Sequence, residues 1–444
     1  NHFIETPDGW EHPTTPWGAP DIQATLDMMQ ASGVPLRRCT DSYRPGGGPC
    51  DMDRVWKSEA EYKKAMEAYE EGGDKWKELL QEGKVSAAMR AVGSNRIPQR
   101  QTSLIMDPAN GQLPALTEEG KRRALQMGSD WPLPGEDIKF DGVEDFDGWD
   151  RCVTRGMPSM MMPYRYNGGF EIIQTPGYVI FNIEMIHEAR IIPIGDSPAP
   201  LDEGVKQWLG ESRGHWEGNT LVVETTNYRD GMSINNVLIN LAVRGAPPGN
   251  RFPVSDQLKT TERIARLNET TWLYEITVED PEILTEPFTV RYPMRHDPDY
   301  TIFEYACHED NMIIRDYISA DRARRANPEP VPEPTPVEAS SEMAEALDGR
   351  WIGHPDIITI DQEIEVEFSK TEDGKVIGRL IGTNFGEIDK PLRDFKIDGQ
   401  TVSFTFPNVD PWNVSAELKE DGTMEGVVFS IQGGRPITFK RASN

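Results

Sequence analysis

The sequence lacks the features that mark several large classes of protein. No apolar run approaches the roughly 18 residues that a membrane-spanning helix needs, so we expect no helical membrane span. Basic residues are in deficit, because 46 Lys and Arg stand against 74 Asp and Glu, which gives a net charge of −28. A surface of this sign repels nucleic acid and anionic membranes, so neither is expected as a main partner.

Cysteine is scarce, with four residues in 444, and none forms a Cys-x-x-Cys pair, so a zinc site built on cysteine is not expected. Cys39 and Cys50 bracket a Pro-Gly-Gly-Gly loop, and Cys152 and Cys307 flank the strand-rich middle of the chain. Each pair is a candidate disulfide. The even count and a first residue other than Met favour an exported protein, periplasmic or secreted, with its signal peptide removed. Four free buried thiols in a shortened cytoplasmic chain are the alternative.

Several catalytic signatures are also missing. The chain has no Gly-x-Ser-x-Gly elbow, no phosphate-binding P-loop, no dinucleotide fingerprint and no EF-hand loop. Only 7 His are present. No cofactor is predicted, and an acid–base site has to be built from these few histidines and from carboxylates.

The residues that are present predict a mainly β protein in four parts. Residues 1–150 form an extended arm and helices that wrap the next part. Residues 151–325 carry eight strand patterns with turn signals between them, which predicts an antiparallel, eight-stranded barrel-like domain. The Pro-Glu run in residues 326–344 predicts a semi-rigid linker, and residues 345–444 predict a small β-barrel.

The expected elements have turn residues at their ends. Helices are expected over Asp53–Arg90, with a break at Gly72-Gly73, and over Thr117–Gln126. The expected strands of the middle part are Phe170–Thr175, Tyr178–Met185, Ala189–Ile194, Thr220–Asn227, Lys259–Leu267, Trp272–Val278, Phe288–Tyr292 and Thr301–Cys307. Those of the last part are Leu347–Trp351, Ile364–Ser369, Lys375–Gly382, Lys390–Ile397, Thr401–Phe406, Asn413–Leu418, Thr423–Ile431 and Pro436–Lys440.

The segment Gln174–Pro193 is the most informative, because it reads as an apolar strand and yet carries Glu184, His187 and Arg190. Ionisable groups in such a strand cost free energy unless they are paired or used. Two later segments also place a histidine beside a carboxylate, at His215 and at His308.

A histidine beside a carboxylate supplies what acid–base catalysis needs, since imidazole titrates near neutral pH and the carboxylate orients it. The predicted catalytic residues are His187, Glu184, His308 and His215. If the three histidines converge, they could instead hold a divalent metal, although no His-Glu-x-x-His spacing is present. The simplest alternative is that each is a structural histidine at a strand end.

Alternation along the strand places Tyr178, Asn182 and Glu184 on one face. We expect this face to line the barrel interior and to bind substrate, with a raised pKa at Glu184. Arg190 and Arg213 would orient an anionic or carbonyl group, and Tyr178 and Trp216 would form an apolar wall. A buried salt bridge from Glu184 to Arg190 or Arg213 is the alternative.

The motifs along residues 13–320 resemble those of a large exported bacterial family of mostly unassigned function. They are Thr15-Pro-Trp-Gly-Ala-Pro-Asp21, Gln174–Pro193, Trp208–Asn227 and Tyr305-Ala-Cys-His-Glu309. The resemblance implies export and this fold, and it implies no particular reaction. The chain departs from the family where Ala24–Gly33 replaces a Gly-(Ile/Val)-Trp motif. Residues 345–444 resemble lipocalin-like barrels appended to exported bacterial enzymes.

Two functions remain open from the sequence. The first is an exported enzyme that acts on a small or oligomeric organic substrate by His/carboxylate chemistry, as a lyase/isomerase or a hydrolase. The second is a non-catalytic ligand-binding or assembly protein with two β-barrel modules, and a homo-oligomer is open in either case. Converging His and Glu side chains beside a cavity would favour the enzyme, and a packed interior with paired charges would favour the binding protein.

Overall fold

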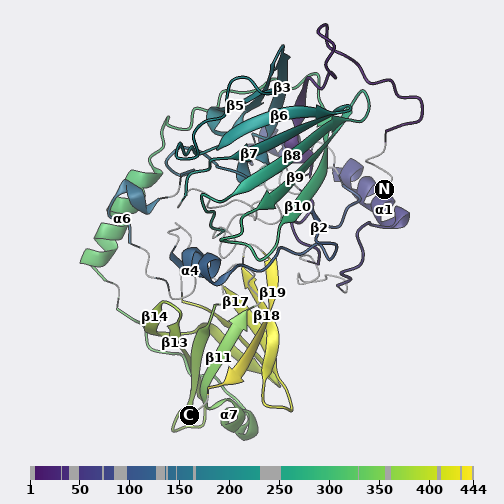
Figure 1. Ribbon diagram of the computed structural model, residues 1–444. Coiled ribbons are helices and arrows are strands. Elements are labelled where there is room, and N and C mark those ends of the chain that lie inside the picture. The colour runs from purple at the N-terminus through teal and green to yellow at the C-terminus, as the bar shows by residue number, and fades with distance from the viewer. Residues whose placement is uncertain are drawn as a thin grey trace.

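The structure is a computed structural model of the chain, and most of its regular elements are strands (Figure 1). The described residues are 6–31, 33–39, 50–72, 75–84, 98–126, 136, 139–146, 148–163, 167–230, 252–328, 330–355, 362–407, 412–430 and 433–442.

The first sheet has ten antiparallel strands. They are β1 (Ala24–Asp27), β2 (Ile105–Asp107), β3 (Gly169–Thr175), β4 (Tyr178–Ile183), β5 (Glu188–Pro193), β6 (Glu211–Glu217), β7 (Thr220–Thr226), β8 (Lys259–Arg266), β9 (Thr271–Glu279) and β10 (Phe288–His296). Nine of them follow the order β5-β4-β3-β1-β10-β9-β8-β7-β6, and β2 pairs with β10 beside this path. The predicted mainly β, barrel-like architecture is confirmed.

The first sheet curls until its two ends nearly meet. Ile194, just after β5, forms a parallel bridge with Gly214 of β6. The contact is close, because a Cβ on Gly214 would lie 2.6 Å from the Cδ1 atom of Ile194, which would then have to shift. Inside the curl, alternate residues of each strand are buried, as in β9, where Trp272, Tyr274 and two aliphatic residues face inward.

Seven of the eight strands expected in the middle part are present, and Thr301–Cys307 is not a strand. The backbone N–H of Phe303 in this segment donates to a carboxylate and not to a neighbouring strand. The sequence also missed β6, which carries Gly214, and the short strands β1 and β2, which the N-terminal part adds to the sheet.

Helices lie outside the first sheet (Figure 1). One helix ends at Gly72 and the next begins at Lys75, and the expected break at Gly72-Gly73 extends beyond the described residues. Thr117 caps the helix that begins at Glu118 by accepting the Gly120 N–H at 3.0 Å. Among the described residues, no helix has the length and apolar character of a membrane span. The helices are α1 (Glu59–Gly72), α2 (Lys75–Gln81), α4 (Glu118–Gln126), α6 (Ile313–Ala326), α7 (Ser341–Leu347) and the 3₁₀ turns η1 (Met28–Ala31), η3 (Val143–Asp145), η4 (Ser159–Met161) and η5 (Met185–His187).

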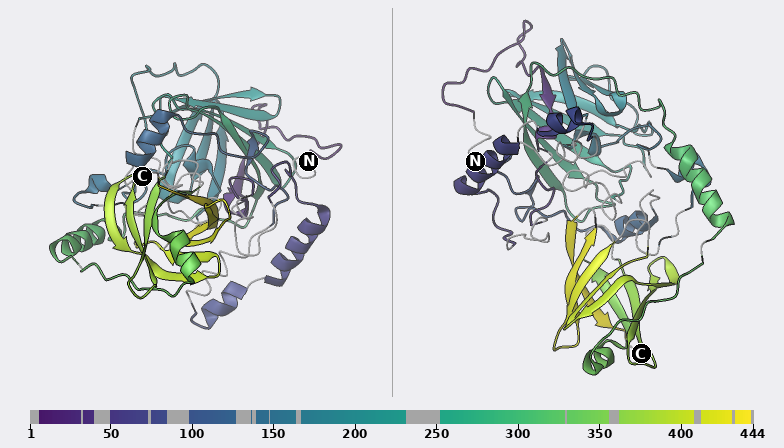
Figure 2. Two further views of the ribbon diagram at one scale, coloured as in Figure 1. Left: turned by 90° about the horizontal axis from the view of Figure 1, so that it is seen from below. Right: turned by 180° about the vertical axis from the view of Figure 1, so that it is seen from behind.

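The second sheet has nine antiparallel strands and curls around its own aromatic core, with α7 at one end (Figure 2). The expected strand Lys390–Ile397 is in fact two strands that meet at Leu392, and the other seven expected strands are present. The strands are β11 (Gly349–Pro355), β12 (Ile364–Lys370), β13 (Val376–Thr383), β14 (Gly386–Pro391), β15 (Arg393–Asp398), β16 (Thr401–Thr405), β17 (Asn413–Leu418), β18 (Met424–Ser430) and β19 (Gly433–Arg441). The division of the chain into domains at residues 150, 325 and 345 stays a prediction.

Both candidate disulfides are present. Cys39 is bonded to Cys50, and Cys152 is bonded to Cys307. The second bond ties the segment after β10 to a segment that precedes β3, and it closes a much longer loop than the first.

Loss of the Cys152–Cys307 bond is expected to cost more stability than loss of the Cys39–Cys50 bond. The two bonds span 155 and 11 residues, and the loop-entropy model assigns them roughly 5 and roughly 3 kcal/mol. Paired Cys→Ser variants of each bond, unfolded in urea, measure this difference. A larger loss from the Cys39–Cys50 variant would contradict the expectation.

Candidate functional site

The candidate site lies at the end of the first sheet where strand β4 ends, and Glu184 is at the centre of the site. Glu184 follows β4 directly and is 2% exposed. Its carboxylate accepts hydrogen bonds from the side-chain amide of Asn167 at 2.7 Å, the hydroxyl of Tyr300 at 2.7 Å and the backbone N–H of Phe303 at 3.1 Å. The three donors satisfy the buried carboxylate, and two of them, Tyr300 and Phe303, fasten the segment after β10 to the sheet.

A second carboxylate, Asp27, lies across one strand from Glu184. Asp27 pairs with Gly169 in the register of β1 and β3, and the backbone N–H of Glu184 donates to the Gly169 carbonyl. A Cβ on Gly169 would lie 2.6 Å from Oε2 of Glu184, so the missing side chain leaves room for this carboxylate. Asp27 and Glu184 therefore lie on either side of Gly169, at the end of the sheet where β4 ends.

The environment of Asp27 disfavours its charge. Burial raises its pKa to about 6, the negative charges of Asp297 and Glu184 add to the rise, and the Met29 N–H opposes it. Burial also raises the pKa of Tyr300, and so does its hydrogen bond to Glu184.

Glu184 was predicted from the sequence and Asp27 was not, because only the register of β1 against β3 brings Asp27 to this end of the sheet.

Replacing Asp27 by Asn is expected to stabilise the protein at neutral pH. Between the ordinary pKa of 3.8 and the folded value of about 6, the folded state binds more protons than the unfolded state, so stability falls as pH rises through this window. The D27N variant stays neutral and can still accept the Met29 N–H. Its free energy of unfolding should be higher by about 1–3 kcal/mol at about pH 7.

Urea unfolding across this pH range measures the effect, and D299N, at an exposed position in the turn that carries Asp297, is the matched control. An unchanged pH slope in D27N would contradict the assignment.

His187 sits on a strained turn between β4 and β5. Both Ile186 and His187 have a φ of 63°, which is rare for residues other than glycine and costs on the order of 1–3 kcal/mol each. The His187 side chain is exposed, and its Nδ1 lies 3.2 Å from the carbonyl oxygen of Tyr305. A carbonyl only accepts, so in the neutral ring this contact places the proton on Nδ1 and leaves the lone pair on Nε2.

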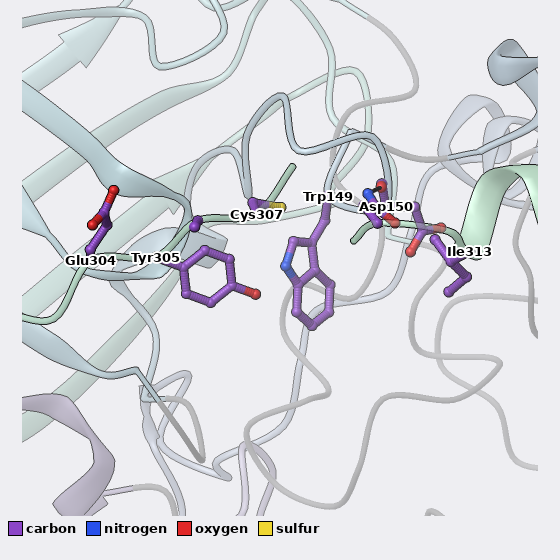
Figure 3. Close-up of a pocket in the computed structure, with 8 residues that line it drawn as sticks. Trp149, Asp150, Glu304, Tyr305, Cys307 and Ile313 are labelled. Atoms are coloured by element: carbon purple, nitrogen blue, oxygen red, sulfur yellow. Dashed lines mark hydrogen bonds between the residues drawn. The ribbon is translucent and has the colours of Figure 1, made fainter. Parts of the chain in front are cut away.

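A pocket of about 510 Å³ lies beside this turn. The contact to the Tyr305 carbonyl joins the His187 turn to the pocket wall. In Figure 3 the rings of Tyr305 and Trp149 lie between the side chains of Glu304 and Asp150. The lining residues are Trp149, Asp150, Glu304, Tyr305, Ala306, Cys307, Asn311 and Ile313.

The pocket has a rigid wall on the side of the Cys152–Cys307 bond. The side-chain amide of Asn311 donates to the carbonyl of Asp150 at 2.8 Å and lies 3.3 Å from Sγ of Cys152. The segments around residues 150 and 307 are therefore joined by a covalent bond and by hydrogen bonds, which hold this wall of the pocket in place.

The barrel interior does not hold the predicted polar face. Tyr178 is 38% exposed and Asn182 is half-buried, whereas Val179, Phe181 and Ile183 are buried. The expectation that Tyr178, Asn182 and Glu184 line the interior is wrong, because the apolar face of the strand is the one that gains free energy from burial.

Arg190, on β5, does face the interior of the first sheet and is 3% exposed. Its guanidinium donates to Glu262 at 2.9 Å, to Ser212 at 2.9 Å and to Thr225 at 3.1 Å. Glu262 also accepts the hydroxyl of Tyr274 at 2.7 Å. The predicted partner of Glu184 is thus paired inside the barrel, and the salt bridge from Glu184 to Arg190 is not formed.

Three of the other predicted residues, Arg213, His215 and Trp216, lie together on β6. His215 is exposed with Nε2 3.5 Å from Glu217, and Arg213 pairs with Glu211 at 3.1 Å. Trp216 is half-buried against the core, and Asn182 donates to Glu171 at 3.1 Å.

His308 is exposed in the turn that follows Cys307. Within the described residues, which include His187, His215 and His308, no group of three His, Cys, Asp or Glu side chains could hold a metal ion. The convergence that the metal alternative needed is therefore not observed.

Comparisons with known proteins leave the chain unassigned. No family model and no curated protein matches it. Among solved structures, a candidate outer membrane protein of Bacteroides fragilis aligns over 62% of this chain and 88% of its own, at 8% identity and a TM-score of 0.14. A protein of unknown function from the DUF3598 family of Nostoc punctiforme aligns over 62% and 87%, at 11% identity and a TM-score of 0.13.

A third solved structure is the endo-1,5-alpha-L-arabinanase of Thermotoga petrophila, which aligns over 62% of this chain and 66% of its own, at 9% identity and a TM-score of 0.16. Likenesses of this size establish neither a shared fold nor a shared activity. The resemblance of the sequence to an exported bacterial family stays a prediction.

Proposed function

We propose that this protein is an exported enzyme that acts on a small or oligomeric organic substrate by acid–base chemistry at the pocket beside His187. The observation that carries the proposal is the orientation of the His187 ring by the Tyr305 carbonyl. This contact holds the ring in the tautomer that leaves Nε2 basic, and the exposed side chain can present Nε2 to a substrate.

The reaction we propose begins with removal of a proton by His187 Nε2. A lyase or an isomerase would use that step on a carbon acid, and a hydrolase would use it on water. The protonated His187 then returns this proton to the product or to the leaving group, and the exposed Glu304 supplies a carboxylate in the pocket. Glu184 is a positioning residue in this proposal, because it binds the segment that carries Glu304 and Tyr305.

Export is part of the proposal and rests on the two disulfides. Disulfides persist in oxidising compartments, so both bonds are compatible with a periplasmic or secreted protein.

The second candidate function is non-catalytic binding or assembly. It is favoured by the packed interior of the first sheet, where Arg190 and Glu262 form a fully buried ion pair beneath aromatic side chains. In this alternative the same pocket binds a ligand and releases it unchanged.

The variant His187→Asn separates the two functions. Asn adopts positive φ readily, so it removes the imidazole without adding backbone strain. Purified protein is incubated with polysaccharides, oligosaccharides and esters, and the release of reducing ends, of acid and of unsaturated products is measured. For an enzyme of this kind, kcat should fall by about 100-fold to 10,000-fold in H187N, with little change in KM.

The matched control is His354→Ala, on an exposed position of β11 in the second sheet, and it should leave turnover unchanged. Full turnover in H187N would refute the role of His187. An absence of turnover in the wild type across these substrates would favour the binding alternative.

A further inference from the structure

We propose that the pocket beside His187 accepts organic cations, such as an amine or a quaternary ammonium group on a small apolar body. The inference rests on the pocket that the proposed function uses, and it adds the chemical class of the ligand. Three observations support it: the charge of the lining, the aromatic walls and the charge of the flanking segments.

The described lining contains two carboxylates, Asp150 and Glu304, and no Lys, Arg or His. Glu304 is exposed and forms no ion pair within the described residues. An anionic ligand would meet repulsion at both carboxylates, whereas a cation would meet attraction.

The aromatic walls suit a cation as well. Trp149 and Tyr305 both line the pocket, and their rings lie between the two carboxylates (Figure 3). The face of an aromatic ring carries negative potential and attracts a cation within about 6 Å of its centre. Ile313 adds an apolar surface for the body of the ligand.

The flanking segments extend the negative field. The stretch from Glu304 to Asn311 carries three acidic residues and no Lys or Arg. The stretch from Asp141 to Asp150 carries five acidic residues, of which Asp141 is paired with Arg325, and it is followed by Arg151. A cleft of one sign concentrates ligands of the opposite sign.

The positive charge of Arg155 lies close to the pocket and has its own counter-charge. The guanidinium of Arg155 lies 5.2 Å from the centre of the Trp149 ring, and Arg155 is buried and does not line the pocket. Its charge interacts with that of Glu188, whose carboxylate accepts the Arg155 backbone N–H at 3.4 Å. Among the residues that line the pocket, the charged side chains are those of Asp150 and Glu304.

The test uses choline and dimethylbutanol, which is the uncharged carbon analogue of choline, as a matched pair of probes. Binding of each to the full chain is measured by isothermal titration calorimetry at low and at high salt, with cellobiose as a neutral sugar probe. We expect choline to bind roughly tenfold more tightly than dimethylbutanol, and we expect this advantage to shrink as salt rises.

Two variants locate the site. Glu304→Gln removes a charge and keeps the shape of the side chain, and it should weaken choline binding by roughly threefold to tenfold. Glu309→Gln changes an exposed carboxylate of the same segment that does not line the pocket, and it should leave binding within about twofold.

Equal affinity for choline and dimethylbutanol, stronger binding of cellobiose, or no binding of choline would each overturn the inference. The catalytic proposal fails separately, because it is tested by the turnover of H187N, whereas this inference is tested by choline binding to the wild type and to E304Q.

Discussion

The local structure around the pocket depends on the burial of one carboxylate, that of Glu184. A buried carboxylate without partners would cost several kcal/mol, so its position requires donors. Its three donors come from Asn167, just before β3, and from Tyr300 and Phe303, after β10. The Cys152–Cys307 bond fixes the same segment a few residues further along. Together these contacts hold a non-strand segment against the sheet and place Tyr305 where its carbonyl meets His187.

The same region also carries features that oppose stability. Ile186 and His187 adopt unfavourable backbone conformations, and Asp27 carries its charge beside two other acids. Features of this kind persist only where the surrounding structure imposes them, and they concentrate at functional sites. Backbone strain, buried charge and an oriented imidazole therefore lie close together at one end of the first sheet, next to the pocket.

The sequence predicted much of the fold, because two-residue alternation and turn residues are local signals. It also identified the segment with Glu184 and His187, since ionisable residues in an apolar strand are conspicuous. It placed the polar face of that segment inside the barrel, and burial of Val179, Phe181 and Ile183 decided otherwise. It missed Asp27 and Trp149, whose roles depend on contacts between distant segments, and no local pattern reveals such contacts.

The most direct test of the central claim is the tautomer of His187 in solution. Nitrogen NMR of protein labelled at histidine, with the His187 signals assigned by comparison with H187N, reports which ring nitrogen carries the proton in the neutral form. The account predicts the Nδ1–H tautomer, because Nδ1 donates to the Tyr305 carbonyl. Observation of the Nε2–H tautomer would contradict it, since His187 would then lack both its orienting contact and its free basic nitrogen.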